Sequence, residues 1–354
     1  MTFFKNIVNF QMVAVALVTI GTISNCAAYN VGTLAGNQPA GYADGKGTEA
    51  KFNEPRGMVV DSGGNVYVAD KNNNCIRKIT PEGVVTTFVG ASTAGYADGT
   101  GMAAQFNKPT GLAIDKDGNI YVADKENNRI RKITPQGIVT TYAGSGASGL
   151  VNAAGTSAQF NHPSGIVFDG NGNLYVVDTL NHCIRKISPQ GMVTTLAGSG
   201  MAGYIDSTGM AAQFNKPFGI VVDNNGNLYV TDEGNNNIRK ITQQGVVTTV
   251  AGATVAGYVD GAGVTAQFNA PAFITIDVQG NLLVADTNNT RIRLVTLPYG
   301  VVTTFAGGAT SGYVDAATTS AQFSKPLGIV DDNKGTFYVA DSDIIRKITP
   351  SGHY

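Results

Sequence analysis

Short apolar stretches alternate with turn residues along most of the chain. In residues 109–143 the stretches are 111–115, 119–124, 129–134 and 138–143, and glycine-containing turns separate the first pair and the last pair. Residues 120–123 are apolar at consecutive positions, which is typical of a strand buried on both faces. Residues 138–143 are rich in β-branched side chains, which favour strands. The pattern predicts four antiparallel strands in this part of the chain.

This four-stranded unit recurs six times. A proline marks the start of each unit, at a spacing of 54 residues with one step of 55: Pro55, Pro109, Pro163, Pro217, Pro271 and Pro326. A phenylalanine stands three residues before each proline, and an aspartate follows each second strand at the same spacing. Four-stranded sheets repeated radially form a β-propeller, in which only short, protected sheet edges remain. The fold class is therefore all-β, with six blades.

The two ends of the repeat region complement each other. The last unit stops after its third strand, at residues 348–354, and lacks a fourth. Residues 31–36 match the fourth strand at residues 85–90, and the spacing from Gly36 to Pro55 equals that from Gly90 to Pro109. We therefore expect residues 31–36 to complete the last blade and close the ring, so that the propeller comprises residues 31–354.

The repeat itself resembles a known family. Residues 106–115, 118–124 and 128–133 are Phe-Asn-Lys-Pro-Thr-Gly-Leu-Ala-Ile-Asp, Gly-Asn-Ile-Tyr-Val-Ala-Asp and Asn-Arg-Ile-Arg-Lys-Ile. This pattern is similar to the NHL repeat, and it recurs over the chain beyond residue 31. The resemblance implies a six-bladed propeller but not one function, because related propellers bind RNA or proteins, sense ligands, or act as lyases and lactonases.

Residues present in nearly every unit are explained most simply by the architecture. We expect the Asp70 series to cap the turn after the second strand, as Asx residues do. We expect the Arg77 series to pair with such carboxylates, and the aspartate of a recurrent Gly-Tyr-x-Asp segment to shape a loop. Cys75 and Cys183 occupy equivalent positions in blades one and three, too far apart for a disulfide, which needs Cα atoms within about 7 Å. Both should be unpaired and buried.

Residues that differ between units are the better candidates for function. They cluster at two positions on one face, called the top: the residue after each proline and the residue after each Asp70-type aspartate. The ligand-binding candidates are Arg56, Thr110, Ser164, Phe218, Lys71, Lys125 and Glu233. Neutral drift at tolerant, exposed positions would produce the same variation.

The N-terminus has the pattern of an export signal. Lys5 precedes a largely apolar run over residues 12–23, too short for a membrane span. Residues 1–28 are therefore expected to be a signal peptide. One alternative is a lipoprotein signal that ends before Cys26, which would then carry the lipid; the other is ordinary cleavage after Ala28. Either way the protein is expected outside the cytoplasm or in the cell envelope.

Composition limits the function classes. The formal net charge is −1, which gives no reason to expect a nucleic-acid partner. The three histidines, His162, His182 and His353, share no repeat position, and no catalytic residue or metal ligand set is identified. We expect a monomeric, exported binding module for a protein, peptide or glycan, with no cofactor and with no membrane contact beyond a lipid on Cys26. A metal-dependent lyase or lactonase with a metal ion in the channel, and a structural envelope protein, are the alternatives.

Overall fold

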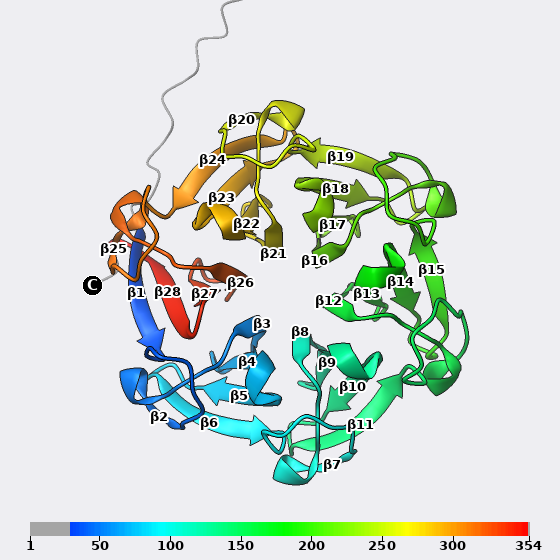
Figure 1. Cartoon of the computed structure of the whole chain (residues 1–354), viewed down its shortest axis with the longest axis horizontal. Coiled ribbons are helices and arrows are strands. Elements are labelled where there is room, and N and C mark those ends of the chain that lie inside the picture. The colour runs from blue at the N-terminus through cyan, green and yellow to red at the C-terminus, as the bar shows by residue number, and fades with distance from the viewer. Residues whose placement is uncertain (1–28, 353–354) are drawn as a thin grey trace, which may run out of the picture.

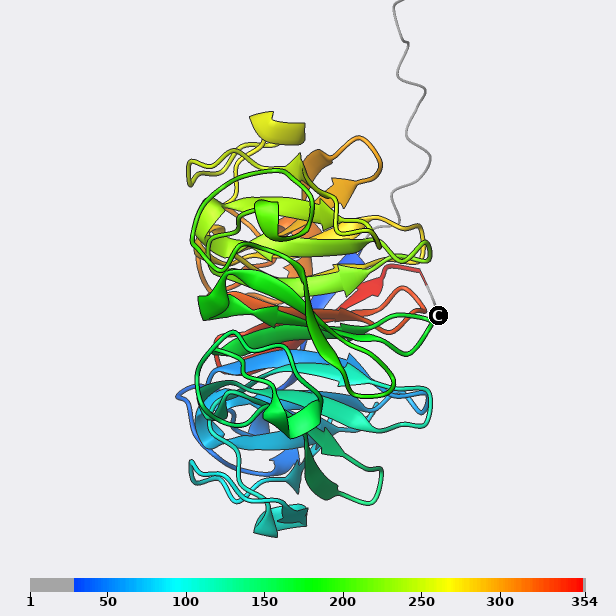
Figure 2. The ribbon, with the colours of Figure 1, turned by 90° about the vertical axis from the view of Figure 1, so that its right-hand side faces the viewer.

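The computed structural model describes residues 29–352, which form a ring of six antiparallel sheets around a central axis (Figure 1). Figure 2 shows the ring edge-on, with the strands of each blade lying side by side. The innermost strands run along the axis and each begins at the repeat proline: β3 (Pro55–Val60), β8 (Pro109–Ile114), β12 (Pro163–Phe168), β16 (Pro217–Val222), β21 (Pro271–Ile276) and β26 (Pro326–Asp331). The predicted fold class is confirmed.

The remaining strands follow outward in chain order. The second strands, buried throughout, are β4 (Val66–Asp70), β9 (Ile120–Asp124), β13 (Leu174–Asp178), β17 (Leu228–Asp232), β22 (Leu282–Asp286) and β27 (Phe337–Asp341). The third strands are β5 (Cys75–Ile79), β10 (Arg129–Ile133), β14 (Cys183–Ile187), β18 (Asn237–Ile241), β23 (Arg291–Thr296) and β28 (Ile344–Pro350). The outer strands are β6 (Val84–Val89), β11 (Ile138–Ala143), β15 (Val193–Ala197), β19 (Val247–Ala251), β24 (Val301–Ala306) and β1 (Tyr29–Ala35).

Short elements decorate the connections between blades. Two-residue strands add a fifth strand to four sheets: β2 (Gly45–Lys46), β7 (Gly99–Thr100), β20 (Gly261–Ala262) and β25 (Ala316–Ala317). Three-residue 3₁₀ turns precede each inner strand: η1 (Gly47–Glu49), η3 (Gly101–Ala103), η5 (Gly155–Ser157), η7 (Gly209–Ala211), η9 (Gly263–Thr265) and η11 (Thr318–Ser320). Five more follow second strands: η2 (Lys71–Asn73), η4 (Lys125–Asn127), η6 (Thr179–Asn181), η8 (Glu233–Asn235) and η10 (Thr287–Asn289).

The last blade takes its outer strand from the start of the described chain. β1 pairs with β28 in antiparallel register, with Val31 opposite Ile348, and this sheet has the order β25-β1-β28-β27-β26. The strand spans Tyr29–Ala35, so it begins two residues earlier and ends one residue earlier than the expected 31–36. The Thr33 backbone N–H donates to Asp315, 2.9 Å away, as the Thr87 N–H donates to Asp44 at 3.1 Å in blade one.

Apolar side chains fill the spaces between neighbouring blades. One cluster, for example, joins Tyr121 and Ile130 of blade two to Phe160, Ile166 and Val176 of blade three. The six phenylalanines that precede the prolines are all fully buried. Because every second strand is covered on both faces, the consecutive apolar residues at 120–123 have the environment that their pattern predicted.

A buried arginine crosses the top of each blade. Arg77 is fully buried and donates from Nη1 to Asp70 Oδ2 at 2.8 Å and from Nη2 to Asp44 Oδ1 at 2.6 Å. Asp70 Oδ1 also accepts from the Asn53 backbone N–H at 2.8 Å. The same arrangement recurs in all blades, although Asn152 replaces the loop aspartate in blade three and accepts from Arg185 at 2.8 Å. The pairing predicted for the Arg77 series and the loop role predicted for the Gly-Tyr-x-Asp series are confirmed. The predicted cap is wrong: the Asp70 carboxylate makes no cap hydrogen bond to the following turn, because its oxygens accept from the Asn53 backbone N–H, the Asn73 side chain and Arg77.

The two cysteines within residues 29–352 are unpaired. Cys75 and Cys183 are completely buried, and burial raises the pKa of both thiols. Their predicted state is therefore confirmed. Cys26 and His353 lie outside the described residues.

Candidate functional site

The variable residues of the top face meet where the inner strands begin. Each inner-strand proline pairs with the aspartate that ends the second strand, for example Pro55 with Asp70, so both variable positions lie at the same end of the ring. Five predicted residues meet here from three blades: Arg56 and Lys71 of blade one, Lys125 of blade two, and Phe218 and Glu233 of blade four. We call this group the mouth.

Two other predicted residues have internal partners instead. Thr110 is buried, and its hydroxyl donates to the Lys108 carbonyl oxygen at 3.0 Å. Ser164 is fully buried; its hydroxyl donates to the Phe218 carbonyl oxygen at 2.8 Å and lies 2.7 Å from the Thr179 hydroxyl. Both side chains therefore serve contacts within the protein, and that of Ser164 joins blade three to blade four.

Glu54 organises the cationic side of the mouth, and the sequence interpretation missed it. Its carboxylate is paired with the Arg56 guanidinium and accepts from Lys71 Nζ at 2.6 Å. Burial opposes its ionisation, but the charge of Arg56, the hydrogen bond from Lys71 and the further lysine charges outweigh burial and lower the pKa of Glu54 to about 2. A signal existed, because the residue before each proline also varies: Glu54, Lys108, His162, Lys216, Ala270 and Lys325.

Lys125 and Glu233 are the mouth charges without direct partners. Among residues 29–352 neither side chain has a hydrogen-bond partner or an ion pair within 4 Å. Burial raises the pKa of Glu233, although the charges of Arg56 and Lys125 oppose the shift. Burial, partly offset by nearby glutamates, lowers the pKa of Lys125. The mouth therefore holds a partly desolvated anion and a partly desolvated cation whose hydrogen-bonding capacity is unused.

Two aromatic rings form the floor of the mouth. The Arg56 guanidinium lies 5.9 Å from the centre of the Phe218 ring, and Phe218 packs edge-on against Phe273 with ring centres 5.2 Å apart. Phe273 occupies a position that is glycine in the other five blades. Gly219 of blade four shows why glycine is usual here: a Cβ at this position would lie 2.5 Å from the Ala272 carbonyl oxygen of the next inner strand. The close contact between neighbouring inner strands therefore leaves no room for a side chain. Blade five departs from this contact and places a phenylalanine ring at the axis.

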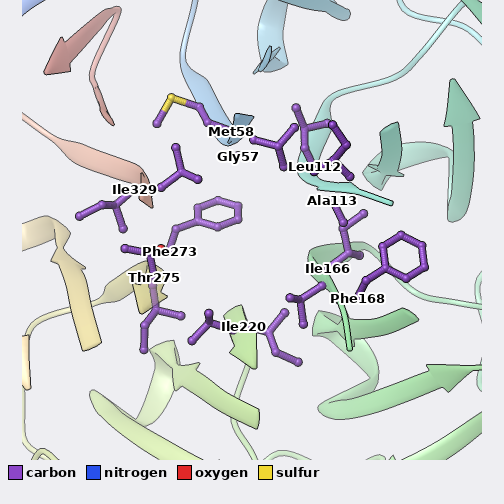
Figure 3. A pocket seen from close by; sticks show the side chains of 16 residues that line it. Gly57, Met58, Leu112, Ala113, Ile166, Phe168, Ile220, Phe273, Thr275 and Ile329 are labelled. Atoms are coloured by element: carbon purple, nitrogen blue, oxygen red, sulfur yellow. The ribbon is translucent and has the colours of Figure 1, made fainter. Parts of the chain in front are cut away.

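Below this floor the channel is apolar. Phe273 points into a central cavity (Figure 3). The cavity has a volume of about 210 Å³ and is lined by one apolar residue from each inner strand: Met58, Leu112, Ile166, Ile220, Ile274 and Ile329. A second layer is formed by Val59 and its equivalents, among which Thr275 is the single polar side chain. Polar binding groups are thus concentrated above Phe218 and Phe273, at the mouth.

Asp331 is a charged residue at the lower end of the inner strands, at a position that is apolar in the other five blades. Its residue is only 6% exposed, and neither carboxylate oxygen has a hydrogen-bond partner among residues 29–352. The five equivalent positions hold Val60, Ile114, Phe168, Val222 and Ile276. Burial raises the pKa of Asp331 to about 6; the nearby backbone N–H groups of Asn333 and Asp332 oppose this shift, and the charges of Asp332 and Asp277 add to it.

The histidines of the described chain are separate from each other. His162 Nε2 lies 3.1 Å from Glu126 Oε2 near the mouth, and His182 Nδ1 accepts from the Lys216 backbone N–H at 3.0 Å. Within residues 29–352, no three His, Cys, Asp or Glu side chains are grouped so that they could hold a metal ion.

A helix that is long and apolar enough to cross a membrane does not occur in the described part of the chain.

Six radially arranged sheets define a β-propeller. Four segments match the family model for the NHL repeat, at residues 52–79, 106–133, 160–187 and 214–241. Blades five and six keep the same proline, aspartate and arginine positions. The chain therefore contains four NHL repeats within a six-bladed β-propeller, as its resemblance to the family implied.

Two curated relatives match the chain over part of their own length. The chain is 31% identical over 281 residues to Protein SUPPRESSOR OF QUENCHING 1, chloroplastic, of Arabidopsis thaliana. The aligned region covers 73% of this chain and 26% of that protein. The chain is 29% identical over 335 residues to NHL repeat-containing protein 2 of Gallus gallus, covering 82% of this chain and 45% of that protein. The chain thus spans less than half the length of these two relatives.

Solved structures share the architecture at low sequence identity. An auxiliary nutrient binding protein from Bacteroides ovatus ATCC 8483 superposes with a TM-score of 0.69 at 20% identity, covering 92% of this chain and 77% of that one. A virginiamycin B lyase from Staphylococcus aureus gives a TM-score of 0.55 at 18% identity, covering 91% and 99%. These similarities show a common propeller fold.

The buried carboxylate of Asp331 predicts a pH-dependent stability defect. Because its pKa is raised in the folded state, ionisation destabilises the protein as the pH rises from about 4 towards 6, and the full penalty persists above that. Asp331→Val should raise the free energy of unfolding at pH 7.5 by about 1–3 kcal/mol. The gain should disappear near pH 4, as measured by urea unfolding.

The reciprocal change, Val222→Asp in blade four, serves as the control and should introduce a defect with the same pH dependence. An Asp331→Val gain that is equal at both pH values would show that the carboxylate is not responsible.

Proposed function

We propose that this protein is an exported binding module that holds a protein, peptide or glycan at the mouth. The observation that carries this proposal is the pair Lys125 and Glu233, whose charged groups are partly desolvated and lack direct partners in the described chain. Such charges cost folding free energy unless a ligand uses them. A bound group with an acidic oxygen for Lys125 and a hydrogen-bond donor for Glu233 would complete both.

The geometry of the mouth supports a specific orientation for the ligand. Glu54 holds the Arg56 and Lys71 side chains on one side of the mouth, so these cationic groups are already positioned before a ligand binds. Glu233 comes from blade four, and the buried Phe218 ring lies beneath the Arg56 guanidinium and supports it. Peptides and glycans carry both hydrogen-bond donors and acceptor oxygens, and both suit such a polar surface.

The same charges argue for recognition without a metal ion. Arg56, Lys71 and Lys125 would repel a divalent cation at the mouth. Binding is also an established use of the architecture, since the similar Bacteroides ovatus protein is an auxiliary nutrient binding protein. We therefore favour binding by a single propeller, without a cofactor, over metal-dependent lyase or lactonase chemistry.

Binding is tested with arrays of immobilised peptides and acidic or neutral oligosaccharides. Wild-type protein should retain a defined subset, and Lys125→Ala and Glu233→Gln should each weaken that binding about tenfold or more, since each removes a charge-assisted hydrogen bond. Lys186→Ala, which removes a bottom-face lysine that lies 5.8 Å from the Tyr175 ring centre, is the matched control and should bind like wild type.

Full retention by both mouth variants would contradict the proposal. A stoichiometric metal ion in the purified protein would instead favour the metal-dependent enzyme.

Export is proposed from the pattern of residues 1–28, with Cys26 as the candidate for lipidation. If Cys26 carries a lipid, the wild-type protein partitions into the detergent phase and Cys26→Ala moves it to the aqueous phase. Export with ordinary cleavage predicts that both proteins are aqueous and extracytoplasmic. Recovery of full-length, uncleaved protein in the cytoplasm of the native cell would contradict export.

A further inference from the structure

A second candidate binding site lies on the bottom face, between blades two and three. It is a groove of about 710 Å³, within the range of roughly 300–1,000 Å³ that is typical of small-molecule sites. Tyr121 forms its centre, with Tyr142 on one side and Phe168 of the next blade on the other. Both flanking rings meet Tyr121 nearly at right angles, with ring centres 4.9 and 4.8 Å away.

The three rings distinguish this groove from its five equivalents. Tyrosine recurs at the Tyr121 position in most blades, but the two flanking positions are elsewhere filled by at most one aromatic ring. The equivalent flanking pairs are Phe88 with Ile114, Leu196 with Val222, Val250 with Ile276, Phe305 with Asp331, and Leu34 with Val60. Rings at all three of these positions therefore occur at one blade junction and are not required by the repeat; a differently built trio, Tyr29, Phe305 and Phe337, lies between blades five and six.

Hydrogen-bonding groups of both kinds border the rings. The Tyr142 hydroxyl has no hydrogen-bond partner among the described residues, and burial together with the Asp115 charge raises its pKa, so that it remains a neutral donor. Lys132 Nζ lies 5.5 Å from the Tyr121 ring centre and has no ion pair within residues 29–352. The Asp115 and Asp169 carboxylates, which accept hydrogen bonds within their own turns, lie along the same groove.

We propose that this groove binds a neutral sugar residue of a glycan. A sugar ring presents C–H faces that pack against aromatic walls, and hydroxyls that both donate and accept hydrogen bonds. Lysines and aspartates are interspersed in the lining, so an anion would meet Asp115 and Asp169, and a cation would meet Lys116 and Lys132. A neutral polyhydroxyl ligand uses both kinds of group without a charge conflict. This site is separate from the mouth and does not depend on it.

The test uses cellotetraose, xylotetraose and mannotetraose as probes, with binding measured by saturation-transfer NMR and calorimetry. Wild-type protein should bind at least one of them. The double variant Tyr142→Leu, Phe168→Val gives this groove the side chains of the next junction, Leu196 and Val222, and should therefore remain folded. Losing two stacking faces should weaken binding by about tenfold or more.

A control variant locates the effect. Phe88→Leu removes the single flanking ring of the neighbouring groove and should bind the tetrasaccharide like wild type. The proposal is overturned if wild-type protein binds none of the three probes, if the folded double variant binds as tightly as wild type, or if Phe88→Leu loses as much affinity as the double variant.

Discussion

The buried arginine of each blade is the interaction on which the ring depends. It joins the aspartate at the end of the second strand to a loop from the preceding connection, and it also donates to two backbone carbonyls; for Arg77 these are Lys51 and Ala43. Removing one partner of such a buried pair costs roughly 3–5 kcal/mol, because an uncompensated charge remains. Each blade must therefore keep its arginine and its carboxylate, and the same top geometry recurs six times.

This repeated framework explains why the differences between blades are informative. The arginine network fixes the positions of the loops. The second residue of each inner strand and the first residue of each 3₁₀ turn that follows a second strand therefore lie at the top of the ring whatever side chains they carry. Arg56, Lys125 and Glu233 thus meet although they are far apart in the sequence. Phe273 closes the space below them, which confines the polar chemistry to one end of the ring.

The repeat made the fold predictable, because six registered copies reveal strands, turns and the missing outer strand without any tertiary information. The site was predictable only in part. Variation between copies identified Arg56, Lys125 and Glu233, but it also selected Thr110 and Ser164, which bond within the protein. Variation cannot show whether a side chain faces the ligand or a neighbouring blade. Glu54 and Phe273 both stand at positions that vary between the blades, but the contacts that define their roles are not visible in the spacing: Glu54 pairs with Lys71, and Phe273 packs against Phe218 of the preceding blade.

The central claim is that the mouth charges serve a ligand and not the fold. The most direct measurement is the free energy of unfolding of the charge-balanced double variant Lys125→Thr, Glu233→Thr, which introduces the residue found at Thr179 and Thr287. If these charges exist for binding, stability should stay within about 0.5 kcal/mol of wild type or increase, because two partly desolvated charges are removed. A loss of more than about 2 kcal/mol would show that the pair is part of the architecture, and would contradict the account.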